Sequence, residues 1–173
     1  LPPSDGGIVF TLLAGAQVIL QAMSTLRIIP LGGLGEVGKN LTVYELGDEL
    51  VVVDAGLAFP RDEHLGVDLV LPDFSYLRER RIRAVLLTHA HEDHVGALPY
   101  LMREMQVPEV WGTRLTLGLL QSKLDEHGLL HATELREAVP GEAPVEIGAF
   151  KAEFIRMAHS VPDTVAIVLE VGG

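Results

Sequence analysis

The feature that most constrains the fold is an apolar strand that leads directly into a cluster of potential metal ligands. Residues 84–87 form the strand, and after Thr88 the chain continues as His89-Ala90-His91-Glu92-Asp93-His94. Residues two apart in an extended segment point to the same side, so His89 and His91 can reach one metal ion together. Asp93 and His94 lie where the chain bends into the next predicted helix, and they can face a second metal ion. Because α/β proteins place ligand sites at the carboxyl ends of buried strands, this pattern predicts a metal centre.

The alternative interpretation of this cluster is a polar surface loop that happens to be rich in histidine. That interpretation would suit a lone histidine. It does not suit this cluster, because the cluster follows a predicted core strand and has apolar flanks on both sides. The chain has no cysteine, which excludes thiolate ligands and agrees with a reducing compartment. A metal site must therefore be built from histidine and carboxylate, a ligand set that suits zinc or manganese.

The charge balance argues against a protein that simply coats nucleic acid. The formal net charge is −11, whereas such proteins normally present a basic face. The argument is weak for an enzyme, because bound divalent cations offset carboxylates and a local patch can be basic in an acidic protein. The dense positive cluster consists of Arg78, Arg80, Arg81 and Arg83. We interpret it as the solvated end of a predicted helix, with Glu79 interleaved.

The order of predicted elements favours a layered α/β sandwich. We predict strands at residues 26–29, 41–46, 50–53, 84–87 and 110–111, a pair of strands within 145–157, and a last strand from 164 to 171. We predict helices at residues 74–80, 96–105 and 114–127. Thr113 is the expected N-cap of the third helix and Gly128 its C-terminal stop. Strands first, followed by strand–helix alternation, are typical of sheets covered by helices.

The first 22 residues differ in character from the rest. Their apolar run, residues 8–20, is broken by Gly15 and Gln17 and is too short for a membrane span. No positive charge precedes the run, as a secretory signal would require. We therefore expect residues 1–22 to be an upstream extension outside the fold, with Met23 as the natural start.

The histidine cluster resembles the His-x-His-x-Asp-His loop that is the hallmark of the metallo-β-lactamase superfamily. The resemblance implies an αββα sandwich that holds two divalent metal ions, with two ligands from His89 and His91 for the first and two from Asp93 and His94 for the second. Asp93 and His94 are also the expected catalytic residues. His159, otherwise a strand-end surface histidine, would complete the first metal site. The implied ligands are His89, His91, Asp93, His94 and His159. Asp54 matches an early aspartate that orients a ligand histidine without binding metal.

Several further segments resemble one branch of this superfamily, the ribonuclease J family of β-CASP nucleases. They are residues 29–40, 53–57, 65–68, 72–77, 89–100 and 159–163. They occur in the family's order and cover residues 26–170 almost continuously. The histidine motif alone is shared with glyoxalase II-like and other hydrolases, so the combination is much more specific.

The glycine-rich segment, residues 29–40, also imitates two nucleotide-binding motifs. Gly33, Gly35 and Gly38 satisfy the dinucleotide pattern, and with Lys39 they nearly complete a P-loop. Both motifs need a helix N-terminus directly after the turn, whereas residues 41–44 are predicted to form a strand. Asn40 also stands where a P-loop needs Ser or Thr. We predict instead a tight loop close to the metal site.

The resemblance implies a metal-dependent ribonuclease with RNA as its partner. A hydroxide bridging two metal ions about 3.5–4 Å apart would attack phosphorus in line. The family combines 5′-to-3′ exonuclease activity with some endonuclease activity and prefers a 5′-monophosphate. The resemblance further implies a homo-oligomer (a dimer or higher) in the full-length protein, a cytoplasmic location and no membrane association. His64, His127 and His131 are assigned no role.

The resemblance also implies that residues 23–173 are an incomplete sandwich, the N-terminal part of a metallo-β-lactamase domain that is truncated before the β-CASP domain. In relatives, the bridging aspartate, the last ligand histidine and the β-CASP domain lie beyond the position of Gly173. We expect the fragment alone to bind metal poorly and to show little nuclease activity. Two alternative functions remain: a small-ester or thioester hydrolase of the same fold, and a non-catalytic metal-binding module.

Overall fold

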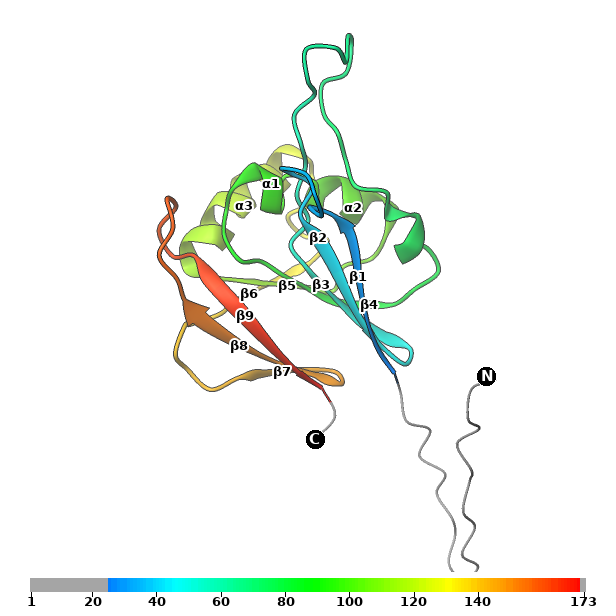
Figure 1. Cartoon of the computed structure of the whole chain (residues 1–173). Helices are drawn as coiled ribbons and strands as arrows, with labels where there is room; N and C mark the ends of the chain where they lie inside the picture. Colours follow the sequence, from blue (N-terminus) through cyan, green and yellow to red (C-terminus); the bar gives the residue numbers. More distant parts are fainter. Residues whose placement is uncertain (1–24, 172–173) are drawn as a thin grey trace, which may run out of the picture.

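Six strands form the larger of two β-sheets (Figure 1). The computed structural model describes residues 25–171, so the predicted extension, residues 1–22, lies outside the described residues. In spatial order the strands are β1 (Leu26–Gly32), β2 (Leu41–Leu46), β3 (Glu49–Val53), β4 (Ile82–Leu86), β5 (Glu109–Gly112) and β6 (Glu134–Glu137). β1, β2 and β3 pair antiparallel, whereas β3, β4, β5 and β6 run parallel. The parallel part brings the carboxyl ends of β3, β4 and β5 to one end of the sheet, which is where such sheets build ligand sites.

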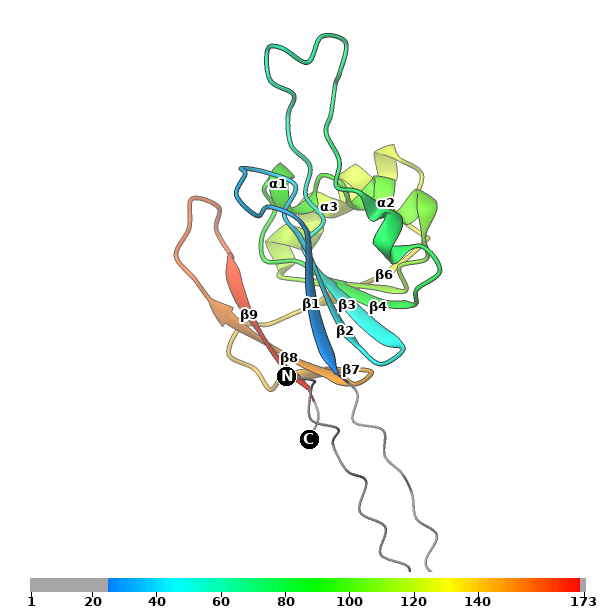
Figure 2. The same cartoon turned by 45° about the vertical axis from the view of Figure 1, so that its right-hand side comes forward.

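The smaller sheet and the helices cover opposite faces of the larger sheet (Figures 1 and 2). The smaller sheet is antiparallel and consists of β7 (Val145–Ile147), β8 (Phe150–Arg156) and β9 (Val165–Val171). The helical segments are η1 (Phe74–Leu77), a 3₁₀ helix, and the α-helices α1 (Glu92–Val95), α2 (Leu98–Glu104) and α3 (Arg114–Glu126). This order of helices, sheet and second sheet confirms the metallo-β-lactamase sandwich predicted from the sequence, in the part of the chain that the structure describes.

Alternation along the central strands builds two cores, one on each face of the larger sheet. Val52 and Val85 belong to the core under the helices, whereas their neighbours Val51 and Ala84 belong to the core between the two sheets. All four side chains are fully buried. Successive side chains of a strand point to opposite faces, so a strand covered on both sides reads as a continuous apolar run. Both faces of β3 and β4 are therefore covered, which keeps their ends in place for the site that follows.

The structure corrects three predictions of secondary structure. The helix expected at residues 74–80 is the short η1, which ends at Leu77 and begins where the Asp73 carboxylate accepts a hydrogen bond from the Ser75 amide. The helix expected at residues 96–105 is α2, which begins at Leu98, and the separate short helix α1 that precedes it was not predicted. Strand β6 was not predicted, because its four residues lack an apolar pattern and only one of them is even partly buried.

Candidate metal centre

The predicted site residues gather at one end of the larger sheet. Asp54 directly follows β3, and His89 and His91 come a few residues after β4. His159 comes from the loop between β8 and β9, and this loop is tied to the same end because the Val165 amide donates to the Thr88 carbonyl at 3.0 Å. The fold therefore assembles residues that are up to about a hundred positions apart in the chain.

His89, His91 and His159 form a group that could hold one metal ion. One ligand nitrogen from each lies within 4.8 Å of the others. His89 Nε2 is 3.0 Å from His91 Nδ1, and the His159 ring centroid is 4.7 Å from that of His89 and 5.0 Å from that of His91. His89 is buried and His159 is exposed, so the group opens from the sheet toward solvent. The arrangement can supply the three imidazole ligands typical of a zinc site that keeps an open position.

The electrostatics of His89 suit a metal ligand. Burial, followed by the neighbouring rings of His94, His91 and His159, lowers the pKa of His89 from 6.5 to about 4. A group with a lowered basic pKa is neutral at every pH above that value, so His89 is an uncharged imidazole at neutral pH. Neutral imidazole is the form that donates its lone pair to a metal ion. The donor set and its protonation therefore fit a divalent cation.

Asp93 and His94 form a second pair of potential ligands beside the three histidines. Asp93 Oδ2 lies 3.5 Å from His94 Nε2, and the ring centroids of His94 and His89 are 4.1 Å apart. Both residues belong to the short helix α1, which turns the chain immediately after His91. The five residues expected as ligands are thus brought together into two neighbouring groups.

The buried carboxylate of Asp54 holds His94. Asp54 Oδ2 is 2.7 Å from His94 Nδ1, which places the hydrogen on Nδ1 and leaves Nε2 free to accept or to bind a cation. Burial lowers the pKa of His94, but the hydrogen bond and charge of Asp54 and the charge of Asp93 outweigh it, and the net pKa is raised. Asp54 itself has a left-handed backbone conformation, with φ +61°. Its position agrees with the orienting role that the resemblance implies.

Thr88 is a residue of the site that sequence reasoning missed. Its hydroxyl lies 2.8 Å from Asp54 Oδ2, 2.9 Å from His89 Nδ1 and 3.3 Å from His94 Nδ1. A hydroxyl has one hydrogen; when it donates to Asp54, it accepts from His89 Nδ1 and leaves His89 Nε2 free. Thr88 therefore fixes the ring orientation of His89 while it supports Asp54. The available signal was a hydroxyl residue directly before the first histidine.

Replacing Thr88 with valine should weaken metal binding by about 10–100-fold, the usual effect of removing a partner that orients a metal ligand. Valine keeps the shape of threonine but removes the hydroxyl and its bonds to Asp54 and His89, while the backbone amide still donates to Asp54. Thr88→Ser keeps the hydroxyl and should retain near-normal affinity. Competition with a chromophoric chelator measures both. Equal affinities for the valine variant and the natural protein would contradict this role.

The loop that carries His159 is hydrogen-bonded to the N-terminus of helix α3. Thr113 occupies the predicted N-cap position of α3, but its side chain makes no capping hydrogen bond. Its hydroxyl donates instead to the Asp163 carbonyl at 3.0 Å, and the Thr164 hydroxyl donates to the Val161 carbonyl at 2.8 Å. The position of the N-cap was thus predicted from sequence, whereas the use of its side chain to anchor the His159 loop was not.

The glycine-rich loop between β1 and β2 passes close to the candidate metal ligands, as the sequence suggested. The Asn40 amide donates to the Asp93 carbonyl at 3.0 Å. β2 begins at the next residue, Leu41. No helix follows the turn, which confirms that neither a P-loop nor a dinucleotide-binding turn is present at this position.

The other three histidines of the described residues lie outside the candidate metal site. His127 is the C-cap residue of α3, and its ring packs edge-on against Tyr100 with centroids 5.4 Å apart. His64 Nδ1 accepts a hydrogen bond from the Arg61 amide at 3.3 Å, and His131 is exposed. None of the three belongs to the histidine group described above.

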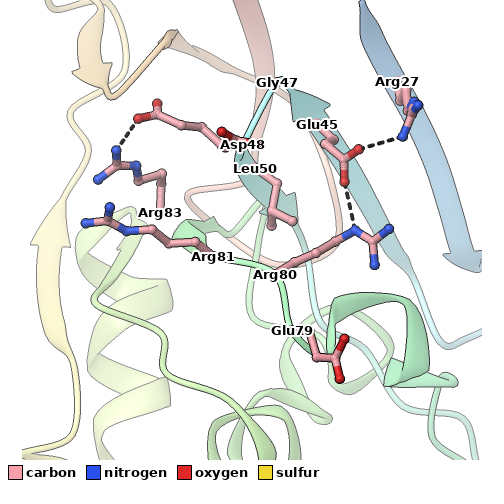
Figure 3. A pocket seen from close by; sticks show the side chains of 10 residues that line it. Arg27, Glu45, Gly47, Asp48, Leu50, Glu79, Arg80, Arg81 and Arg83 are labelled. Atoms are coloured by element: carbon pink, nitrogen blue, oxygen red, sulfur yellow. Dashed lines mark hydrogen bonds and ion pairs between the residues drawn. The ribbon is translucent and has the colours of Figure 1, made fainter.

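A cavity of about 670 Å³, separate from the histidines, is lined by three members of the arginine cluster, Arg80, Arg81 and Arg83 (Figure 3). The cavity lies where β2 ends and β3 and β4 begin, and the candidate metal ligands lie at the opposite end of β3 and β4. Its arginines are largely paired: Arg80 Nε is 3.0 Å from Glu45 Oε2, and Arg83 forms an ion pair with Glu49. These contacts correct the interpretation of a merely solvated helix end, because η1 ends before the arginines and their charges are used to bind acidic side chains.

None of the helices within residues 25–171 combines the length and apolar character that a membrane crossing requires.

Comparisons with known proteins agree with this architecture. The family model described as Metallo-beta-lactamase superfamily matches residues 34–172. A ribonuclease J from Helicobacter pylori is 44% identical over 153 residues, which cover 87% of this chain and 22% of that protein. A ribonuclease J from Thermus thermophilus is 48% identical over 152 residues, covering 83% of this chain and 26% of that protein. The chain therefore spans about a quarter of the length of these curated relatives.

Solved structures with low sequence identity share the fold. Zinc-bound PqqB from Methylobacterium extorquens aligns with a TM-score of 0.60 at 14% identity, over 84% of this chain and 62% of that one. YhfI from Bacillus subtilis, described as a metallo-beta-lactamase fold protein, aligns with a TM-score of 0.58 at 18% identity, over 84% of this chain and 57% of that one. At these identities the likeness concerns the fold alone.

Proposed function

The chain belongs to the metallo-β-lactamase superfamily, and we propose that it supplies the metal-binding residues of a metal-dependent ribonuclease. The observation that carries the proposal is the convergence of His89, His91 and His159 within 4.8 Å, with Asp93 and His94 beside them. The similarity to ribonuclease J proteins, at 44–48% identity, supports RNA as the substrate. The reaction would be the hydrolysis of RNA phosphodiester bonds.

The five candidate ligands would hold two divalent metal ions, zinc or manganese. His89, His91 and His159 would bind the first ion, and Asp93 and His94 would contribute to the second. Bound divalent cations supply Lewis acidity, which activates water at neutral pH and offsets the charge that builds on a phosphate during hydrolysis. Asp93 and His94 are the residues we propose as catalytic, through their place in this site.

The surrounding residues would keep the ligands in the form and orientation that binding needs. Burial keeps His89 neutral, with a pKa of about 4. Asp54 accepts the Nδ1 hydrogen of His94, so His94 presents Nε2 to the site. The Thr88 hydroxyl joins His89 to the Asp54 carboxylate that holds His94. The chain would thus prepare both ligand groups before any metal ion binds, which reduces the reorganisation that binding requires.

The proposal extends to the properties that the ribonuclease J resemblance implies. These are 5′-to-3′ exonuclease activity with some endonuclease activity, a preference for RNA with a 5′-monophosphate, assembly into a homo-oligomer, and a cytoplasmic location without membrane association. The support for them is the sequence similarity of this chain to ribonuclease J relatives, over about a quarter of the length of those relatives.

RNA degradation by the full reading frame that contains this chain tests the proposal. With manganese or zinc added, RNA bearing a 5′-monophosphate should release mononucleotides faster than the same RNA bearing a 5′-triphosphate. Removal of metal by a chelator should slow hydrolysis by at least about a hundredfold, because the ions contribute several kcal/mol of transition-state stabilisation. Labelled RNA separated on a denaturing gel reports both effects.

Three outcomes would count against the proposal in different ways. A folded, metal-loaded protein that leaves RNA intact but hydrolyses small esters or thioesters would point to a different hydrolase of this fold. Stoichiometric metal binding without turnover of either substrate class would indicate a metal-binding module. Unchanged RNA degradation after complete metal removal would contradict a metal-dependent mechanism.

A further inference from the structure

Asn40, the last residue of the glycine-rich loop, makes polar contacts with the potential ligands of the second metal ion. We propose that Asn40 is a positioning residue for this site, which fixes Asp93 and faces His94 without itself binding metal. The inference rests on the proposed assignment of Asp93 and His94 as ligands. It gives the glycine-rich loop a function in building the metal centre, in place of the nucleotide binding that its sequence imitates.

The side-chain amide nitrogen of Asn40 has three polar atoms of Asp93 and His94 around it. Asn40 Nδ2 lies 3.0 Å from the Asp93 carbonyl oxygen, 3.3 Å from Asp93 Oδ2 and 3.1 Å from His94 Nε2. Asp93 Oδ2 and His94 Nε2 are themselves 3.5 Å apart, so the amide completes a small triangle with the two candidate ligand atoms. An NH₂ group offers hydrogens and no lone pair to a cation, so Asn40 acts on the ligands and not as one of them.

The surroundings also settle which end of the carboxamide faces the site. Two of the neighbours of Nδ2 are oxygen atoms of Asp93, which accept hydrogen bonds whatever the protonation of His94. Placing Asn40 Oδ1 there would bring it against these two acceptors. The donor end therefore faces the metal centre, because a hydrogen-bond network decides the orientation of an asparagine amide.

The backbone around Asn40 fixes Asp93 as well. The Asn40 amide donates to the Asp93 carbonyl at 3.0 Å, and the Gly56 amide donates to the Asn40 carbonyl at 2.9 Å. The Asp93 carbonyl thus receives both the main-chain and the side-chain donor of one residue. These bonds join the β1–β2 loop, the segment after β3 and helix α1, so the position of the Asp93 carboxylate depends on the glycine-rich loop.

Gly33 provides the space that Asn40 needs. Its φ is +79°, a conformation that favours glycine. A Cβ atom built on Gly33 would overlap Asn40 Oδ1, the end of the carboxamide that points away from the metal centre. Gly35, two residues later in the same loop, has a similar φ of +74° but nothing within 4 Å of a Cβ built there. The two glycines therefore share a backbone requirement, and only Gly33 touches Asn40.

Asn40→Ala should lower the affinity for the second metal ion by about 10–100-fold, the range for partners that orient a metal ligand. The affinity for the first ion, at His89, His91 and His159, should stay unchanged. Zinc titration of the metal-free full reading frame, in competition with a chromophoric chelator, resolves the two affinities and counts ions per chain. Circular dichroism and thermal unfolding of the metal-free variant show whether it is folded as the natural protein is.

A pair of glycine substitutions tests the same mechanism without removing the amide. Gly33→Ala should lower the affinity for the second metal ion, as Asn40→Ala does. Gly35→Ala introduces the same backbone strain and should leave that affinity unchanged. The double variant Gly33→Ala/Asn40→Ala should bind the second ion no more weakly than Asn40→Ala alone, because both changes act through one contact. Comparing the two single glycine variants separates displacement of Asn40 from strain in the loop.

The inference is wrong if the Asn40→Ala variant binds two ions as tightly as the natural protein. It is equally wrong if the folded variant loses affinity for both ions to the same extent. It is also wrong if the natural protein binds a single ion, since there is then no second site to position. The proposed function fails separately. A protein that binds two ions, loses the second with Asn40→Ala and leaves RNA intact would keep this inference and exclude the ribonuclease.

Discussion

His91→Ala should reduce RNA hydrolysis by the full reading frame at least about a hundredfold, because losing a ligand removes metal-ion catalysis worth several kcal/mol. His91 is only half-buried, and His89 Nε2 and the His159 ring face it across the first group of ligands. Two imidazoles would remain of the three, and the remaining pair should hold the first ion much more weakly. The loss of activity should therefore accompany a loss of bound metal.

Metal content and RNA cleavage measured on the same protein preparation check this prediction. His131→Ala is a matched control, because it removes an exposed histidine that is not part of the ligand group. That variant should keep the metal content and the rate of the natural protein. Full activity of His91→Ala with undiminished metal would show that the histidine cluster is not the reaction centre.

Gly56→Ala should destabilise the domain by about 3 kcal/mol or more, the upper end of the usual cost of overpacking a core. A Cβ built on this buried residue would overlap the carbonyl carbon and oxygen of Asp93 and crowd the amide of His94. These are backbone atoms, so no side chain can rotate away. The Ala55 amide donates to the His94 carbonyl at 2.7 Å and the Leu57 amide to the Glu92 carbonyl at 3.0 Å, and both bonds would be strained.

Thermal unfolding of the full reading frame measures this loss, with roughly 2–4 °C expected per kcal/mol for a domain of this size. Gly118→Ala is the matched control. Gly118 lies in α3 with nothing within 4 Å of an added Cβ, and alanine there should stabilise the helix by about 0.5–1 kcal/mol. Equal unfolding midpoints for the two variants would mean that the segment after β3 and helix α1 are not in the close contact described here. The Gly56 variant should also bind metal poorly, because its overlap displaces Asp93.

Much of the fold could be predicted because its strands carry strong local patterns. β2 lies at the predicted residues 41–46, and β3 and β4 differ from the predicted strands by one or two residues at their ends. Strands buried on both faces read as apolar runs, and these strands have that property. β6 was not predicted, because its exposed residues have little apolar pattern. η1 was predicted too long, because its two buried side chains, Phe74 and Leu77, fit a longer helix as well as a single turn.

The candidate site was predictable where chemistry is concentrated in a short stretch. Four potential ligands within six residues identified the histidine loop, and the family resemblance added His159 and Asp54. Thr88 and Asn40 were missed as parts of the site, because a threonine and an asparagine have many ordinary uses in a sequence. Their importance lies in the atoms they meet, and those atoms come from other elements of the fold.

The sequence by itself determined the identity of the potential ligands, the absence of cysteine from the donor set, and the apolar runs that allow both faces of β3 and β4 to be covered. These properties are local, since they depend on residue type and on spacing along one strand or turn. Only the tertiary structure decided that His159 lies beside His89, that Asp54 binds His94, and that Asn40 holds Asp93. Such contacts join segments between about 40 and 70 positions apart, and their distances follow from how the sheets and loops pack.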